Sequence, residues 1–519
     1  MTGTEFRAPR FITRAGFWRG RHSAGAAATP GLRIGPDSVF WPAAAAAAFT
    51  LTVLLTSPLR MKLGWDETVY ASQISQHVPI MPWAAERARG MPLLLAPVTL
   101  VTESTFAFRC YVTVLAGTAL FLALLAWRGT RPGWQLGVAG VIFGGLGVAQ
   151  VQAYQLFPNY WIAMGCLAGA GLTARAIRNG GASWPVLAAL LVAAAFTALM
   201  RPIDAVAAFA PLILLALLAL RVRAIPVVLA AAGGLVIGVG EWVVEAYMYF
   251  GGPSARLKSA TSAVGGTHLN LLTNLRILDG DTTNTVRAAS LPGYPGATGW
   301  THPWLLVWWA ALLLLIILGV LAARRTGGWW FALAPVIPAV CIYLQYSLVV
   351  RDNMRYLLPA WALLAVPAAD GIAWLAVAVR PRIQTAGLMA TAVIVAFLAV
   401  ELVSQHALAV TRDAGLAIST RQDATAAAAL KRLGVHAPCV VTSVPHANPM
   451  PVAYYANCAY VDGQHSVGAL RGNQVVVLVP GRGQPWKYAM HWSRHKVAGQ
   501  GGLFAYISPP AKTGTAGNG

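Results

Sequence analysis

Long apolar stretches alternate with short polar segments from about residue 40 to residue 405. Stretches of about 17 to 25 apolar residues are long enough to cross the hydrocarbon core of a bilayer as helices. The Arg201-Pro202 step interrupts one long apolar run between two of these stretches. The pattern predicts an α-helical polytopic membrane protein with about eleven transmembrane helices. Their centres fall near residues 48, 116, 143, 166, 191, 211, 237, 312, 340, 366 and 395.

The composition agrees with this pattern. Hydrophobic residues make up 57% of the chain and charged residues 11%, whereas a soluble domain usually carries about 25% charged residues. These values exclude a disordered protein, a disulfide-rich miniprotein and a cytosolic enzyme. The net charge is +21, but arginines scattered singly and in pairs are not the compact basic block of a nucleic-acid-binding protein. The expected partner is therefore a lipid bilayer and no nucleic acid.

Pairs of arginines between the apolar stretches predict the orientation. Because loops rich in Lys and Arg stay in the cytoplasm, the five loops with such pairs and no acidic residue are expected inside, together with the basic tail. We expect a multi-pass protein of the plasma (inner) membrane with a cytoplasmic N-terminus and an extracytoplasmic C-terminus. The long basic tail before Phe40 argues against a cleaved signal peptide. The pairs are Arg128/Arg131, Arg175/Arg178, Arg221/Arg223, Arg324/Arg325 and Arg380/Arg382.

Past residue 406 the pattern changes to short apolar strands separated by helical pieces, which is typical of a small α/β domain. We expect a helix over 424–433 and then strands beginning near Cys439, Ala459, Gln474 and Gly502. The predicted parts are a basic cytoplasmic tail, a transmembrane domain with two outer loops, an extracytoplasmic α/β domain and a disordered tail. Their ranges are 1–38, 39–406 with loops near 58–104 and 251–302, 407–508 and 509–519.

Two of the five cysteines, Cys439 and Cys458, lie in the predicted extracytoplasmic domain, where oxidation is permitted. Each stands at the start of a predicted strand, with a helical connection between them. Consecutive parallel strands joined by a right-handed crossover are usually neighbours, about 4.8 Å apart, and this spacing suits a disulfide. We therefore predict a Cys439–Cys458 bond; the alternative is two unrelated buried thiols.

Adjacent carboxylates at Asp66 and Glu67 follow the first apolar stretch, with Trp65 and Tyr70 beside them. A carboxylate at a membrane surface can act as a general base or hold a metal ion. The structural alternative is a helix start, because acidic residues in a first turn interact favourably with the helix dipole.

Four short motifs, in order, resemble those of the GT-C glycosyltransferases that use polyprenyl-phosphate-linked sugars, such as protein mannosyltransferases and aminoarabinose transferases. They are Trp65-Asp66-Glu67-x-x-Tyr70, Arg89-Gly-Met-Pro-Leu-Leu-Leu-Ala-Pro97, Ala198-Leu-Met-Arg-Pro-Ile-Asp204 and Asn353-Met-Arg-Tyr-Leu-Leu-Pro-Ala360. The second motif lacks the family's usual Lys or His before its Pro. The resemblance implies a GT-C-like fold and a glycosyltransferase that inverts the anomeric centre. It would transfer a hexose or pentose from a polyprenyl-phosphate-sugar donor to a cell-envelope acceptor, which is a glycan, a lipid or a protein.

The resemblance also implies roles for individual residues. Asp66 matches the family's catalytic carboxylate, and Glu67 is its neighbour in the catalytic pair, with orientation of the acceptor or of the loop as its implied role. The implied substrate-binding residues are Tyr70, Arg201, Arg351, Arg355 and Tyr356. Bidentate arginines suit a lipid phosphate. The alternatives are snorkelling of Arg351 and Arg355 to head groups, and a structural ion pair of Arg201 with Asp204.

Further acidic residues lie in or near the second outer loop. Asp279-Gly-Asp281 resembles an Asp-x-Asp metal motif, which makes a divalent cation a candidate cofactor, but Asp-Gly-Asp is also good turn chemistry. His268 and His302 share that loop. Glu241 and Glu245 occupy one helix face, either buried toward a cavity or in contact with substrate.

Two other functions suit part of this pattern. A transporter or flippase for a lipid-linked or anionic substrate would line its path with Arg201, Asp204, Glu241 and Glu245. The lack of an internal repeat argues against it. A non-catalytic membrane scaffold is the third possibility.

Overall fold

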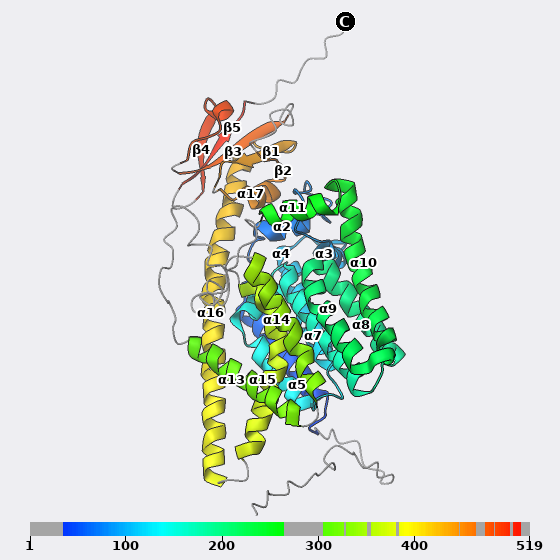
Figure 1. Cartoon of the computed structure of the whole chain (residues 1–519). Coiled ribbons are helices and arrows are strands. Elements are labelled where there is room, and N and C mark those ends of the chain that lie inside the picture. Colours follow the sequence, from blue (N-terminus) through cyan, green and yellow to red (C-terminus); the bar gives the residue numbers. More distant parts are fainter. Residues whose placement is uncertain are drawn as a thin grey trace, which may run out of the picture. The chain divides into compact units, whose positions relative to one another are not determined.

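The structure is a computed structural model that describes residues 35–263, 305–325, 328–349, 354–379, 384–445, 447–462, 473–481, 483–498 and 502–509. Most of the described chain is helical, and a small five-stranded sheet follows the last long helix (Figure 1). The predicted fold class, a helical membrane protein with a small C-terminal α/β region, is confirmed.

A helix lies at each predicted apolar centre. Six helical segments among the described residues are long and apolar enough to cross a membrane, or up to seven if the bent pair α5–α6 counts as one span. The chain is therefore a multi-pass membrane protein, although α1, α3 and α8 are shorter apolar helices. The first helices are α1 (Phe40–Thr56), α2 (Trp65–Ser72), α3 (Gly90–Thr99), α4 (Thr105–Leu125), α5 (Gly133–Gly144), α6 (Gly147–Tyr154) and α7 (Pro158–Arg178).

The chain continues through a second group of helices, two of which are separated by the break predicted at Arg201-Pro202. Arg201 is extended, with a φ of −162°, as expected before a proline, which disfavours the helical conformation at the preceding residue. The group comprises α8 (Trp184–Met200), α9 (Pro202–Leu220), the 3-10 helix η1 (Arg221–Ala224), α10 (Ile225–Tyr249), α11 (Pro253–Ala263), α13 (Leu305–Arg325), α14 (Trp329–Val349), η2 (Met354–Leu357) and α15 (Leu358–Val379).

Small residues allow the helices α13 and α15 to approach closely. A Cβ atom on Gly319 would lie 1.9 Å from the Pro367 carbonyl oxygen, and one on Gly371 would lie 2.1 Å from the Leu315 carbonyl oxygen. Neither position accepts a larger residue without separating the two backbones. Such small-residue contacts are typical of helix packing in membranes, where apolar surface alone gives little drive for association.

The helix α16 (Gln384–Arg432) differs from the prediction. It is one continuous helix of 49 residues, whereas we expected a span ending near residue 406 and a separate helix over 424–433. The sequence contains many alanines and no proline over this range, so nothing interrupts helix propagation. At 1.5 Å per residue it is roughly 70 Å long, more than twice the hydrocarbon thickness. Figure 1 shows α16 leading directly to the sheet.

The C-terminal sheet has the strand order β2-β1-β3-β5-β4. Strand β1 pairs in parallel with β2 and β3, whereas β5 runs antiparallel to β3 and β4. Cys439 and Cys458 form a disulfide with a Cα–Cα distance of 4.8 Å. The elements are β1 (Cys439–Ser443), α17 (Pro449–Ala456), β2 (Ala459–Tyr460), β3 (Gln474–Pro480), the 3-10 helix η4 (Lys487–Ala489), β4 (Ser493–Ala498) and β5 (Leu503–Ile507).

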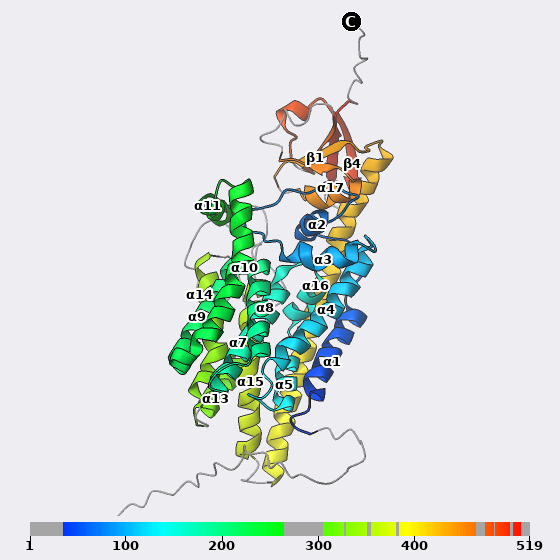
Figure 2. The same cartoon turned by 90° about the vertical axis from the view of Figure 1, so that its right-hand side faces the viewer.

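Helix α17 connects this small domain to the short helix α2, which carries Asp66. Figure 2 shows α17 beside α2. The Leu63 amide donates a hydrogen bond to the Tyr455 hydroxyl at 2.6 Å, and the ring of Trp65 meets that of Tyr460 edge to face at 6.4 Å. Burial raises the pKa of Tyr455 to about 12, so the phenol stays neutral. The start of α2 is thus fixed by residues almost 400 positions later in the chain (392 for Leu63 and Tyr455).

Candidate active site

Asp66 lies in the first turn of α2 and contacts two arginines. Its Oδ1 atom accepts a hydrogen bond from Arg87 Nη2 at 2.5 Å, and its Oδ2 atom lies 3.5 Å from Arg355 Nη1. Arg355 comes from η2, nearly 290 residues further along the chain. The Asp66 side chain is 28% exposed and those of both arginines are mostly buried. The carboxylate is therefore held by two cations but still reaches solvent.

Arg87 is supported by Tyr70, which follows Asp66 one turn later in α2. The Arg87 guanidinium lies 5.0 Å from the centre of the Tyr70 ring. Burial raises the pKa of Tyr70, so the ring presents a neutral face to the cation. The Arg87 Nε atom is buried and has no hydrogen-bond partner among the described residues. Arg87 was not identified from the sequence, because nothing near it in the chain indicates its partner.

Arg201 forms a second ionic group where α8 ends and α9 begins. Its Nη1 atom donates to Asp204 Oδ2 at 3.1 Å, to Asn159 Oδ1 at 3.1 Å and to the Tyr346 hydroxyl at 2.9 Å. Asp204 is fully buried and also accepts hydrogen bonds from Tyr346 at 2.6 Å and Gln345 at 2.8 Å. The ion pair anticipated as the alternative for Arg201 is present, and the Arg201 side chain retains 19% exposure.

Tyr356 joins the two groups. The guanidinium of Arg201 lies 4.9 Å from the centre of its ring, and that of Arg355 lies 5.1 Å away. The ring of Tyr346 stacks on it at 5.1 Å. Five of the predicted site residues, Asp66, Tyr70, Arg201, Arg355 and Tyr356, are therefore brought together. Among the described residues, three guanidinium groups and two carboxylates meet in this cluster.

Glu67 points into the protein, away from this cluster. It is 2% exposed. Its two oxygens accept hydrogen bonds from Arg109, one from Nη1 at 2.8 Å and one from Nη2 at 3.0 Å. The same oxygens accept the Gly64 amide at 2.8 Å and the Leu156 amide at 3.1 Å. With both oxygens occupied in this way, Glu67 is suited to hold α2 rather than to take a proton.

Arg109 is a further residue that the sequence reading missed, although a signal for it exists. It is fully buried in the apolar helix α4, and it also donates to the carbonyl oxygens of Met61, Lys62 and Tyr154. A charged residue inside an apolar span needs a partner. Glu67 is that partner for Arg109.

Several predicted residues lie outside the described part of the chain: Arg351, Asp279, Asp281, His268 and His302. Within the described residues, no group of three or more His, Cys, Asp or Glu side chains could hold a metal ion. The divalent-cation site at Asp279 and Asp281 stays a prediction.

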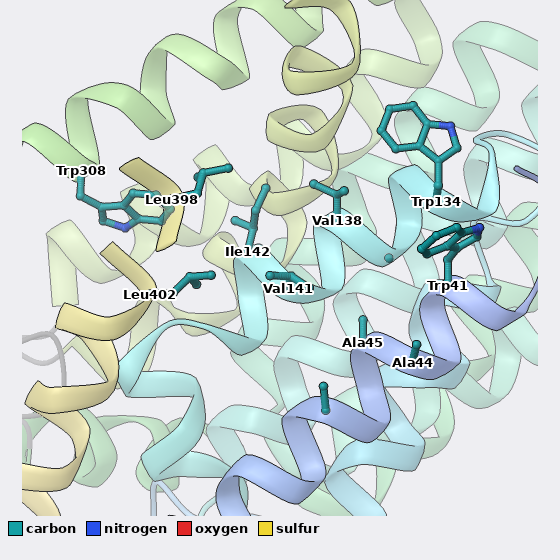
Figure 3. A pocket seen from close by; sticks show the side chains of 12 residues that line it. Trp41, Ala44, Ala45, Trp134, Val138, Val141, Ile142, Trp308, Leu398 and Leu402 are labelled. Carbon is teal, nitrogen blue, oxygen red and sulfur yellow. The ribbon is translucent and has the colours of Figure 1, made fainter. Parts of the chain in front are cut away.

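A cavity of about 520 Å³ lies elsewhere in the helical region, between α1, α5, α13 and α16 (Figure 3). Its walls are apolar, and Trp41, Trp134, Trp308 and Leu398 are among the side chains that line it. None of the Asp66 cluster contributes to it. Its chemistry suits a hydrocarbon chain rather than a reaction centre, so the geometry of the charged side chains is the better guide to the active site.

No family model and no curated protein matches this sequence. Solved structures do match its fold. The crystal structure of ArnT from Cupriavidus metallidurans bound to undecaprenyl phosphate has a TM-score of 0.59 and 14% sequence identity, and the match covers 91% of this chain and 98% of that one. The apo state of the same protein gives a TM-score of 0.58 at 14% identity, with 90% and 98% covered.

The archaeal oligosaccharyltransferase AglB from Archaeoglobus fulgidus is also similar. Its complex with an inhibitory peptide and a dolichol-phosphate gives a TM-score of 0.53 at 10% identity, covering 85% of this chain and 69% of that one. These proteins are GT-C glycosyltransferases. The chain therefore has the GT-C fold, and the resemblance seen in the four motifs is confirmed at the level of the fold.

Proposed function

We propose that the chain is an integral membrane glycosyltransferase that transfers a sugar from a polyprenyl-phosphate-linked donor to a cell-envelope acceptor on the outer face of the membrane. The observation that carries the proposal is the position of Asp66, a partly exposed carboxylate held between Arg87 and Arg355. It places a proton acceptor next to cations suited to a phosphate. The undecaprenyl phosphate bound to ArnT and the dolichol-phosphate bound to AglB support a donor of this class.

The reaction needs two things from the protein. The acceptor hydroxyl attacks the anomeric carbon, the bond between that carbon and the phosphate oxygen breaks, and the electron pair leaves with the polyprenyl phosphate. A base must take the hydroxyl proton, and Asp66 is assigned this role. Cations must stabilise the charge that develops on the leaving phosphate. Arg355 is assigned this second role, together with Arg201, which lies on the other side of Tyr356. Attack from the face opposite the phosphate inverts the anomeric centre.

The ion pairs of Asp66 give the two roles a physical link. In the absence of donor, Arg87 and Arg355 hold Asp66 ionised but also weaken it as a base, because an adjacent cation favours the charged form of a carboxylate. A donor phosphate that binds the same arginines withdraws positive charge from Asp66. Donor binding would therefore raise the basicity of Asp66 at the moment when a base is needed.

A transporter or flippase is less well supported. Such a protein needs its intramembrane charged groups to be available along a path. Asp204 is occupied by Arg201, Gln345 and Tyr346, and Glu245 accepts hydrogen bonds from Trp83, Arg89 and Arg256. These carboxylates are already neutralised within the protein.

The proposal is tested with purified protein in lipid nanodiscs. The protein is incubated with a panel of polyprenyl-phosphate sugars and acceptor glycans, and mass spectrometry follows released polyprenyl phosphate and glycosylated product. We expect one donor to give both products in equal amounts, with the anomeric configuration inverted. In sealed proteoliposomes, movement of an intact lipid-linked sugar between leaflets without cleavage would contradict the proposal and support the flippase.

A further inference from the structure

The loop that carries Arg87 is held by two residues far away in sequence. We define the Arg87 loop as residues 83–89. Glu245, near the end of α10, accepts a hydrogen bond from the Trp83 indole at 3.2 Å and one from Arg89 Nε at 2.6 Å. Arg89 also lies over the Trp83 ring at 4.2 Å. Both ends of the loop are thus attached to one carboxylate.

Arg256, in the following helix α11, holds the backbone between these ends. Its Nε atom donates to the Ala85 carbonyl at 3.1 Å, and its Nη2 atom donates to the Arg87 carbonyl at 2.8 Å and to Glu245 Oε2 at 2.7 Å. Its Nη1 atom donates to the Trp242 carbonyl at 2.8 Å. Arg256 is fully buried. The guanidinium therefore contacts the backbone of the residue whose own side chain contacts Asp66.

The turn between α10 and α11 makes this arrangement possible. Gly251 and Gly252 have φ values of +76° and +113°, which residues with a side chain adopt only rarely. The turn directs α11 back so that Arg256 meets Glu245, which precedes it by 11 residues. An isolated buried ion pair is weak evidence for stability, because desolvation offsets its attraction. Its value here lies in the several directed hydrogen bonds that converge on one short loop.

We propose that Glu245 and Arg256 are positioning residues that fix the Arg87 loop so that the Arg87 guanidinium meets Asp66. Neither residue contacts Asp66; the contact with that carboxylate is made by Arg87. Glu245 also holds Arg89, which donates a hydrogen bond to Gln73 at the end of α2 at 2.9 Å. This inference rests on the proposed function insofar as Arg87 serves the donor phosphate. The attachment of the loop itself is independent of it.

Helix α10 provides a matched control for testing the attachment. Glu241 lies one turn before Glu245, is a partly buried carboxylate, and has an Oε2 atom without a hydrogen-bond partner among the described residues. Hydrogen exchange measured by mass spectrometry on the intact protein in nanodiscs compares Glu245→Gln with Glu241→Gln. We expect amide exchange in residues 83–89 to rise about tenfold in Glu245→Gln and to stay unchanged in Glu241→Gln. Unchanged exchange in Glu245→Gln would overturn the inference, whatever the protein binds.

The route through Arg87 is tested by the affinity for undecaprenyl phosphate. We expect Glu245→Gln and Arg87→Gln each to weaken binding by about tenfold, and the double variant to bind no more weakly than Arg87→Gln alone. A coupled pair gives such non-additive effects. A full additional loss in the double variant would overturn the proposed route through Arg87. If Arg87→Gln leaves the affinity unchanged, the phosphate role of Arg87 fails, and increased exchange in Glu245→Gln still supports the attachment.

Discussion

Asp66 and Arg87 are separated by 21 residues and form an ion pair with an N–O distance of 2.5 Å. The pair links the start of α2 to the loop that precedes α3. Because the Arg87 loop is attached to α10 and α11, while α2 is attached to the C-terminal domain through Tyr455, the carboxylate lies where three parts of the chain meet. Its position therefore depends on the whole assembly, which is what a reaction centre requires.

Arg355 is expected to bind the donor phosphate. Replacing it with lysine keeps the charge but removes the planar pair of donors that suits a phosphate. We expect Arg355→Lys to weaken undecaprenyl phosphate binding by about tenfold, as measured by titration in nanodiscs. The control is Arg131→Lys, which alters another mostly buried arginine, paired with Asp370 at 2.9 Å. Equal losses in both variants would indicate a general effect on folding and contradict the assignment.

Glu67 is expected to matter for stability more than for proton transfer. In Glu67→Gln the buried Arg109 loses its counter-charge, and breaking a buried ion pair typically costs about 3–5 kcal/mol. We therefore expect a large fall in the melting temperature for Glu67→Gln and only a small one for Asp66→Asn, whose carboxylate is partly exposed. A Glu67→Gln protein that melts like the wild type but has no transferase activity would restore Glu67 to the catalytic pair.

The Cys439–Cys458 bond ties β1 to the residue before β2. Without reductant, we expect Cys439 and Cys458 to resist alkylation after denaturation, while the three other cysteines react. The double replacement Cys439→Ser/Cys458→Ser should lower the stability of the C-terminal domain by up to about 3 kcal/mol by loop-entropy reasoning. Alkylation of all five cysteines in the unreduced protein would contradict the bond.

The orientation that we expect from the arginine pairs has a direct test at the two ends of α10. Lys258 in α11 and Arg223 in η1 are both exposed. A cysteine at position 258 should react with an impermeant thiol reagent in intact cells, whereas one at position 223 should react only after the cells are opened. The reverse pattern would overturn the orientation and the outer location of Asp66.

The helical part of the fold could be predicted because apolar length alone locates a helix in a membrane protein. The continuity of α16 could not, because its change from apolar to mixed composition near residue 406 resembles the end of a span. The local absence of proline was the better guide there. The Cys439–Cys458 pairing followed from strand order, a local property of a βαβ connection.

The site was predictable only in part. Asp66, Arg355 and Tyr356 stand in short motifs, so the sequence indicates them directly. Arg87, which holds Asp66, is itself held by Arg256 of α11, 169 residues further along the chain. Nothing in the local sequence distinguishes such arginines from surface residues, and tertiary structure is needed to find them.

The most direct measurement is the envelope glycan composition of a deletion strain that expresses either the wild-type chain or Asp66→Asn at equal membrane abundance. Asn keeps the shape of Asp66 but cannot take the acceptor proton, and loss of a general base typically lowers the rate by about 10²–10⁴-fold. The exposed Asp37→Asn serves as the control for a changed carboxylate. We predict that wild type and Asp37→Asn restore a glycosylated component that the deletion strain lacks, and that Asp66→Asn does not. Full restoration by Asp66→Asn would contradict the assignment of Asp66 as the catalytic base.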